Sequence, residues 1–140
     1  MKTFQSLAFL CALLLLALSA PAQERANIKG SYSVLSNSKH DVLERSDLKA
    51  YPPDNYIYFH KNHIRVDDNA GSIYTITSQP NKRETPKMNF VNWSARDEQG
   101  IACEVVLIWY KEDGYIICRV EYPVGKNFRS YCYLVEFENQ

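Results

Sequence analysis

The sequence lacks the short motifs that mark the common enzyme classes. It contains no G-x-S-x-G elbow, no H-E-x-x-H pair and no glycine-rich phosphate loop. Neither Glu104 nor Glu121 is predicted to have a paired carboxylate for general acid–base chemistry. We therefore expect a protein that is not an enzyme and that needs no cofactor.

An excess of charge of either sign is also missing. The chain has 16 Lys and Arg residues against 16 Asp and Glu residues. Like charges are scattered, with no block of about five or six that would mark an interaction tail. Nucleic acids and acidic membranes attract proteins through clustered basic side chains, so neither is expected as a partner.

Long apolar runs are absent except at the start of the chain. Residues 7–18 carry no charge, follow Lys2, and precede Ala20-Pro21-Ala22, which fits an A-x-A cleavage site. This run is shorter than the roughly 20 residues of a membrane-spanning helix, and no later segment approaches that length, so no membrane span is expected. The pattern predicts that residues 1–22 are a cleaved signal peptide. Residues 23–140 then form one domain of a secreted or periplasmic protein.

Cysteine is sparse and has no C-x-x-C spacing, so thioredoxin-like redox chemistry has no support. Cys11 lies inside the apolar run and not at its end, which argues against a lipid anchor. Cys103, Cys118 and Cys132 remain after cleavage. An odd number of cysteines leaves at least one thiol outside any internal bridge.

What the chain does contain is a succession of short segments rich in Tyr, Ile, Val and Thr, many of them alternating apolar and polar residues. Both features are typical of half-buried β-strands. A short surface helix or ordered loop is predicted over 39–50, and a polar loop over 78–86. The eight predicted strands are 30–36, 56–60, 63–67, 72–77, 88–93, 101–110, 115–122 and 128–137.

These strands predict an all-β fold that closes on itself. Successive neighbouring hairpins favour an eight-stranded antiparallel up-and-down barrel, with a β-sandwich as the alternative. A four-residue loop over 111–114 would place Trp109 opposite Ile116 and continue one apolar face across both strands.

The last hairpin predicts a disulfide. If residues 123–127 form a five-residue loop, Tyr122 lies opposite Phe128 and Cys118 lies opposite Cys132. Directly opposed residues of an antiparallel pair are about 4.5 to 5.5 Å apart at Cα, which a disulfide can span. Export would favour its oxidation, whereas the other interpretation is that both cysteines are small buried hydrophobic residues.

His60 and His63 bracket a two-residue turn, which would place both imidazoles on one side of the hairpin. A divalent metal binds such clusters, but no third ligand stands at a fixed spacing. The turn therefore reads as a solvated hairpin tip, and no metal site is predicted.

The order of these parts resembles the small lipocalin-like proteins, also called calycins. Gly30-Ser31-Tyr32 stands where that family has G-x-W, and Arg129 stands where its last strand carries an arginine. The resemblance covers nearly all of residues 23–140. It implies an eight-stranded barrel whose mouth binds a small apolar ligand.

Two functions follow from this reasoning. The first is an exported, non-enzymatic binding protein that holds a small hydrophobic or amphipathic molecule in the barrel, with Trp109, Tyr122 and Phe128 lining the cavity and Tyr32 at its floor. The second is a protein-binding or inhibitory module that acts through its surface. In both cases we expect a monomer.

Overall fold

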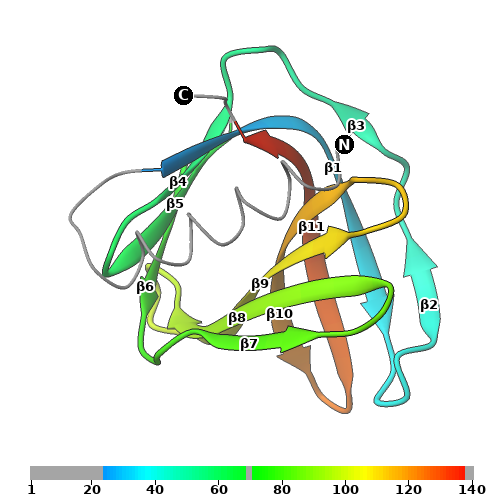
Figure 1. Cartoon of the computed structure of the whole chain (residues 1–140). Coiled ribbons are helices and arrows are strands. Elements are labelled where there is room, and N and C mark those ends of the chain that lie inside the picture. The colour runs from blue at the N-terminus through cyan, green and yellow to red at the C-terminus, as the bar shows by residue number, and fades with distance from the viewer. Residues whose placement is uncertain (1–23, 69–70, 138–140) are drawn as a thin grey trace.

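The computed structural model describes residues 24–68 and 71–137, which form an all-β domain without helix (Figure 1). The predicted signal peptide, its cleavage site and Cys11 lie outside the described residues. Within the described ranges no helix has the length and hydropathy that crossing a membrane requires. The strands are β1 (Glu24–Ser36), β2 (Val42–Arg45), β3 (Lys49–Ala50), β4 (Tyr56–Phe59), β5 (His63–Asp67), β6 (Ser72–Ile76), β7 (Asn81–Glu84), β8 (Met88–Arg96), β9 (Ala102–Tyr110), β10 (Ile116–Val124) and β11 (Asn127–Phe137).

The strands close into a barrel. The ring runs β1, β4, β5, β6, β8, β9, β10 and β11, and β11 pairs with β1 to complete it. Every pairing in the ring is antiparallel. The predicted eight-stranded up-and-down barrel is therefore confirmed. The sandwich alternative is wrong, because the pairing of the first strand with the last leaves no open edge between two sheets.

Three short strands lie outside the ring. β2 and β3 pair with the second half of β1, and β7 pairs with β8 (Figure 1). The predicted helix or loop over 39–50 is thus two short strands, and the predicted loop over 78–86 contains a strand. All residues of these three strands are exposed, so no periodic burial signalled them in the sequence.

β1 is longer than the predicted 30–36 because it pairs with β11 along its length and with three shorter strands on its other edge. Its first residues pair with β4, and its second half pairs with β2 and β3. Its pairing with β11 has an irregular register between Ile28 and Gly30. A Cβ at Gly30 would lie 3.0 Å from Cδ1 of Leu48 and 3.1 Å from the carbonyl oxygen of Lys49. Leu48 and Lys49 can therefore approach β1 this closely only because residue 30 is a glycine.

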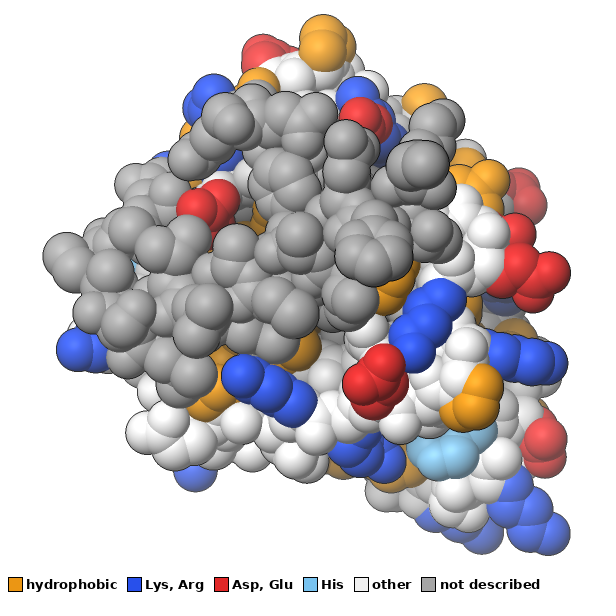
Figure 2. All heavy atoms as spheres, in the orientation of Figure 1, with side chains coloured by type: hydrophobic (Ala, Val, Ile, Leu, Met, Phe, Trp, Pro, Cys, Tyr) orange, Lys and Arg blue, Asp and Glu red, His pale blue; other side chains and the backbone are white. Residues whose placement is uncertain are grey.

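The core lies on the inner face of the ring. β9 pairs with β10 as predicted, with Trp109 opposite Ile116, so this hairpin presents one apolar face to the interior. Fully buried side chains from strands all round the barrel complete the core: Ile28, Ile57, Ile64, Val66, Val91, Val105, Leu107, Cys118 and Val120. The outer surface carries interspersed basic and acidic side chains on the face shown in Figure 2.

The predicted register of the last hairpin is wrong by one residue. Cys118 lies opposite Tyr133, and Cys132 lies opposite Arg119. Because side chains alternate between the two faces of a strand, this shift turns every β11 side chain to the other face. The predicted Cys118–Cys132 bridge is absent, and all three described cysteines are free and buried.

The shift arises at the turn. The β10–β11 ladder continues to the Val124–Asn127 pair, which leaves Gly125 and Lys126 as a two-residue connection in place of the predicted five-residue loop. Gly125 has a φ of 63°, which a type II′ turn needs at its first central position. Pro123 is accommodated because the β9–β10 ladder ends at the Glu121–Glu104 pair, so its missing N–H breaks no hydrogen bond to β9.

Candidate functional site

The two ends of the barrel differ in chemistry. At the terminal end, β1 begins and β11 ends, beside the β4–β5 turn, the β6–β7 connection and the β9–β10 turn. At the opposite end, called the tyrosine end, lie the β5–β6 and β8–β9 loops and the side chains of Tyr74, Tyr122 and Tyr133. The terminal end holds the candidate binding site.

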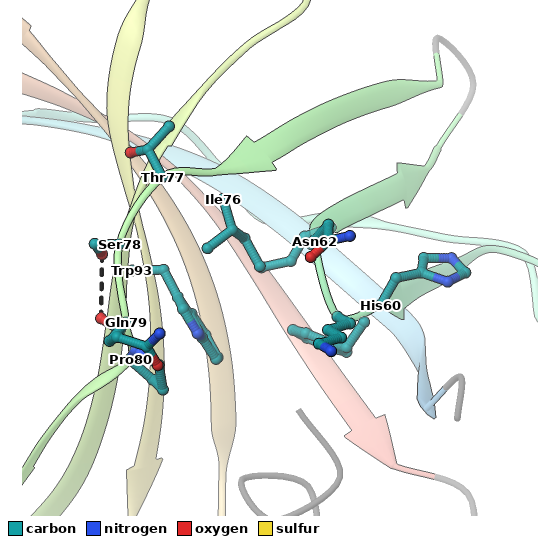
Figure 3. A pocket seen from close by; sticks show the side chains of 11 residues that line it. His60, Asn62, Ile76, Thr77, Ser78, Gln79, Pro80 and Trp93 are labelled. Atoms are coloured by element: carbon teal, nitrogen blue, oxygen red, sulfur yellow. Dashed lines mark hydrogen bonds between the residues drawn. The ribbon is translucent and has the colours of Figure 1, made fainter. Parts of the chain in front are cut away.

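A cavity of about 410 Å³ lies at the terminal end, between the β4–β5 turn and the β6–β7 connection. In Figure 3, Trp93 and Pro80 stand on one side of this space and Asn62 stands on the other. The lining residues are Phe59, His60, Lys61, Asn62, Ile64, Ile76, Thr77, Ser78, Gln79, Pro80 and Trp93.

The apolar part of the lining is rigid because it belongs to the core. Phe59, Ile64 and Trp93 are buried, with exposed fractions of 5%, 1% and 3%. The Phe59 ring centroid lies 6.5 Å from that of Trp93 and 5.7 Å from that of Phe137. Strands β4, β5 and β8 thus supply an aromatic and aliphatic floor whose side chains are fixed by packing.

The rim is polar and comes from the two connections. The Ser78 hydroxyl donates a hydrogen bond to the Gln79 carbonyl at 3.1 Å (Figure 3). It also accepts one from the backbone N–H of Ser94 at 2.8 Å, which ties the β6–β7 connection to β8. Of the lining residues that the structure describes, Lys61 is the one charged side chain apart from the titratable His60. An apolar floor with a few polar rim groups suits a small amphipathic molecule.

The imidazole of His60 points away from Trp93, toward the outside of the barrel (Figure 3). It stacks on His63, with centroids 4.2 Å apart and an angle of 17° between the rings. Burial lowers the pKa of His60, and the neighbouring His63 and Arg65 lower it further. Among the described residues, no three His, Cys, Asp or Glu side chains gather as metal ligands.

Trp109 lies at the terminal end, on the inner face of β9. It is 2% exposed, and it lies directly opposite Asn89 of β8, which is 7% exposed. Nε1 of Trp109 and Oδ1 of Asn89 are both buried, and neither has a hydrogen-bond partner within the described part of the chain.

Tyr122 lies on the inner face at the tyrosine end, away from the cavity. Its hydroxyl donates a hydrogen bond to Oδ2 of Asp97 at 2.9 Å. Burial raises the pKa of Tyr122, and the neighbouring Tyr74 and the Asp97 carboxylate raise it further. The Tyr133 hydroxyl lies 3.4 Å from Oδ2 of Asp68, and burial likewise raises its pKa. These tyrosines stay protonated and donate to loop carboxylates, which joins the loops to the barrel wall.

Tyr32 and Phe128 lie on the outer face, contrary to the expected interior positions. Tyr32 lies opposite Cys132 and packs under the Arg45 guanidinium, whose carbon is 4.6 Å from the ring centroid. Burial and the neighbouring Cys132 raise the pKa of Tyr32 to about 12. The observed register of β11 differs by one residue from the predicted one, so Phe128 lies on the outer face and contributes nothing to the interior.

Phe128 instead lines an outer cleft of about 610 Å³ that also contains a carboxylate pair. Glu104 and Glu121 are directly opposed on β9 and β10, so the expectation that neither has a paired carboxylate is wrong. Their pairing was available in the sequence, because the register that places Trp109 opposite Ile116 also places Glu104 opposite Glu121. Glu121 is already engaged by Arg119 at 3.9 Å and Ser130 at 3.4 Å.

The residues of the terminal-end cavity were missed by the sequence analysis. Alternation in 56–67 marks Phe59 and Ile64 as inward-facing, and Trp93 stands in a predicted strand, so each was visible as a core residue. Their convergence depends on ring closure and on the position of the 77–80 connection, which no local pattern encodes.

Comparisons with protein-family models, with curated proteins and with solved structures find no match to this chain.

Proposed function

We propose that this is an exported, non-enzymatic binding protein that holds a small hydrophobic or amphipathic molecule at the terminal end of its barrel. The observation that carries the proposal is the cavity of about 410 Å³ with its buried floor of Phe59, Ile64 and Trp93. Binding pockets for small molecules have volumes of roughly 300 to 1,000 Å³ and combine apolar walls with few polar groups. The barrel is also compatible with the resemblance to lipocalin-like proteins.

The site favours a neutral or anionic ligand over a cationic one. Among the described residues that line the cavity none is acidic, and Lys61 and His60 are the titratable ones. A cation would therefore enter without a partner for its charge, whereas an apolar body would be covered by Trp93 and Phe59. Trp93 makes the site observable, because ligand contact changes tryptophan fluorescence.

A space-filling substitution tests the proposal. N-phenyl-1-naphthylamine, a neutral apolar dye that fluoresces when sheltered from water, serves as the probe. Ile76→Trp enlarges a cavity-lining side chain, and we expect it to weaken dye binding at least tenfold. Ile73→Trp makes the same change on the outward face of the same strand, where Ile73 is 40% exposed, and serves as the matched control. Equal binding by wild type and both variants would refute the site.

The surface-module alternative has one observation in its favour. Val42, Leu43 and Leu48 of the β2–β3 segment are 61%, 50% and 60% exposed. Apolar side chains on an edge strand are a common basis for protein recognition. Native mass spectrometry of protein purified from its own host separates the two functions, because a copurified small molecule supports the barrel site and a copurified protein supports the surface.

A further inference from the structure

The inner face at the terminal end contains a buried donor and a buried acceptor that have no partner among the described residues. Nε1–H of Trp109 can only donate a hydrogen bond, and Oδ1 of Asn89 can only accept one. Trp109 and Asn89 expose 2% and 7% of their surface, and neither atom has a partner within residues 24–68 and 71–137. Folded proteins leave few buried polar atoms unpaired, so this pair calls for a bound group.

The two side chains are neighbours on the inner face. Asn89 and Trp109 are directly opposed residues of β8 and β9, and both side chains face inward. Opposed side chains of an antiparallel pair have Cβ atoms about 4.5 to 5.5 Å apart, which one small polar group can bridge. The same row of the inner face continues through Ile116, Val135 and Ile28, so the surroundings of the pair are apolar.

The chemistry of the pair selects among head groups. A hydroxyl can accept from Trp109 and donate to Asn89 at the same time. A carboxylate has no proton for the Asn89 oxygen, and an ammonium group has no lone pair for the Trp109 N–H. A hydrocarbon leaves both atoms unpaired, and sites built to hydrogen-bond a hydroxyl discriminate strongly against analogues that lack it.

We infer that the barrel binds an apolar molecule with a hydroxyl head group, an alcohol or a phenol, whose hydroxyl bridges Nε1–H of Trp109 and Oδ1 of Asn89. This inference rests on the proposed function. Asn89 and Trp93 lie on the same inward face of β8, so the polar pair and the apolar cavity floor belong to one wall of the barrel. A permanently bound water is the competing occupant, because it also donates and accepts.

Three probes with one apolar body test the head group: 4-propylphenol, propylbenzene and 4-propylbenzoate. Trp93 and Trp109 are the only tryptophans of the chain, so ¹⁵N-labelled protein has two indole N–H resonances, which Trp93→Phe assigns. We expect 4-propylphenol to bind at least about tenfold more tightly than either analogue and to shift the Trp109 resonance downfield. Propylbenzene should shift the Trp93 resonance and leave that of Trp109 in place.

Substitution of the acceptor gives the decisive comparison. Asn89→Leu keeps the side-chain size and removes the acceptor, so the preference for 4-propylphenol over propylbenzene should disappear while propylbenzene still binds. Asn92→Leu makes the same change on the outward face of β8 and should keep the preference. Trp109→Phe removes the donor and provides a second test if Asn89→Leu does not fold.

Equal affinity for phenol and hydrocarbon in the wild type would overturn the inference, while the proposed function would stand. Failure of all three probes and of N-phenyl-1-naphthylamine to bind would instead refute the proposed function and the inference together.

Discussion

Cys118 and Cys132 lie on opposite faces of the barrel wall. Cys118 is opposite Tyr133 and is fully buried in the core, whereas Cys132 is opposite Arg119 on the outer face, beside Tyr32. A disulfide between them would have to pass through the sheet. An oxidising compartment would therefore not produce a disulfide between Cys118 and Cys132.

We expect residues 23–140 to contain three free thiols. Alkylation with iodoacetamide in denaturant, without reductant, should add three groups to residues 23–140. In native buffer Cys118 should react slowest, because its side chain has no exposed surface and burial raises its pKa to about 12. A product with one adduct and a mass lower by two hydrogen atoms would contradict the register.

The extent to which the sequence predicts this fold is clear from its last two hairpins. In β9–β10 the connection was identified as a four-residue loop, and the resulting Trp109–Ile116 pairing is correct. In β10–β11 the five-residue loop over 123–127 is too long, because Pro123, Val124 and Asn127 lie in the strands. The incorrect register also looked chemically sensible, because it opposed Glu121 to Arg129. In the structure Arg129 instead lies 3.6 Å from Glu44 of β2, a strand that burial periodicity does not reveal.

The candidate site was less predictable than the fold, for a physical reason. Trp109 and Tyr122 were placed inward from alternation alone, but they lie toward opposite ends of the barrel. Alternation reports which face a side chain occupies, and it carries no information about which loops converge above it. The cavity beside Trp93 depends on the β6–β7 connection, whose polar residues resemble any surface loop.

Gly125 sets the register of the last hairpin, so its replacement should cost stability. Gly125→Ala must place a Cβ at a φ of 63°, which disfavours an L-residue by roughly 1 kcal/mol, although no heavy atom lies within 4 Å of the added carbon. Lys126→Ala in the same turn is the control and should change the free energy of unfolding by less than about 0.5 kcal/mol. Urea denaturation monitored by fluorescence measures both. Equal stability of Gly125→Ala and wild type would argue against this turn.

Stability should fall above pH 9. Burial raises the pKa of Cys118 from 9.0 to about 12 and that of Cys103 to about 11, so both thiols ionise in the unfolded chain before they ionise in the folded one. Their contribution is complete below pH 9 and is lost as pH rises toward the folded values. Each such group lowers the free energy of unfolding by about 1.4 kcal/mol per pH unit within that window.

The variant Cys118→Ala shows how much of the stability lost above pH 9 comes from the Cys118 thiol. It should be less stable than wild type at pH 7, because it leaves a void in the core, but its stability should fall less steeply between pH 9 and 12. The tyrosines of the tyrosine end contribute only above pH 10, because their unfolded pKa is higher. Chemical denaturation at successive pH values measures the slope. Parallel pH profiles for wild type and Cys118→Ala would show that Cys118 is not buried.

Glu104 and Glu121 oppose like charges across β9 and β10, so neutralising one should stabilise the protein. Directly opposed like charges destabilise a strand pair by roughly 0.2 to 1 kcal/mol, and Glu104→Gln removes the repulsion while Arg119 still engages Glu121. The gain in unfolding free energy should be largest at low salt and should shrink as added salt screens the two charges. Glu112→Gln in the neighbouring exposed turn is the control, with no expected gain. If Glu104→Gln destabilises the protein, the carboxylate has an attractive partner in the outer cleft, and that cleft becomes the second region to test for binding.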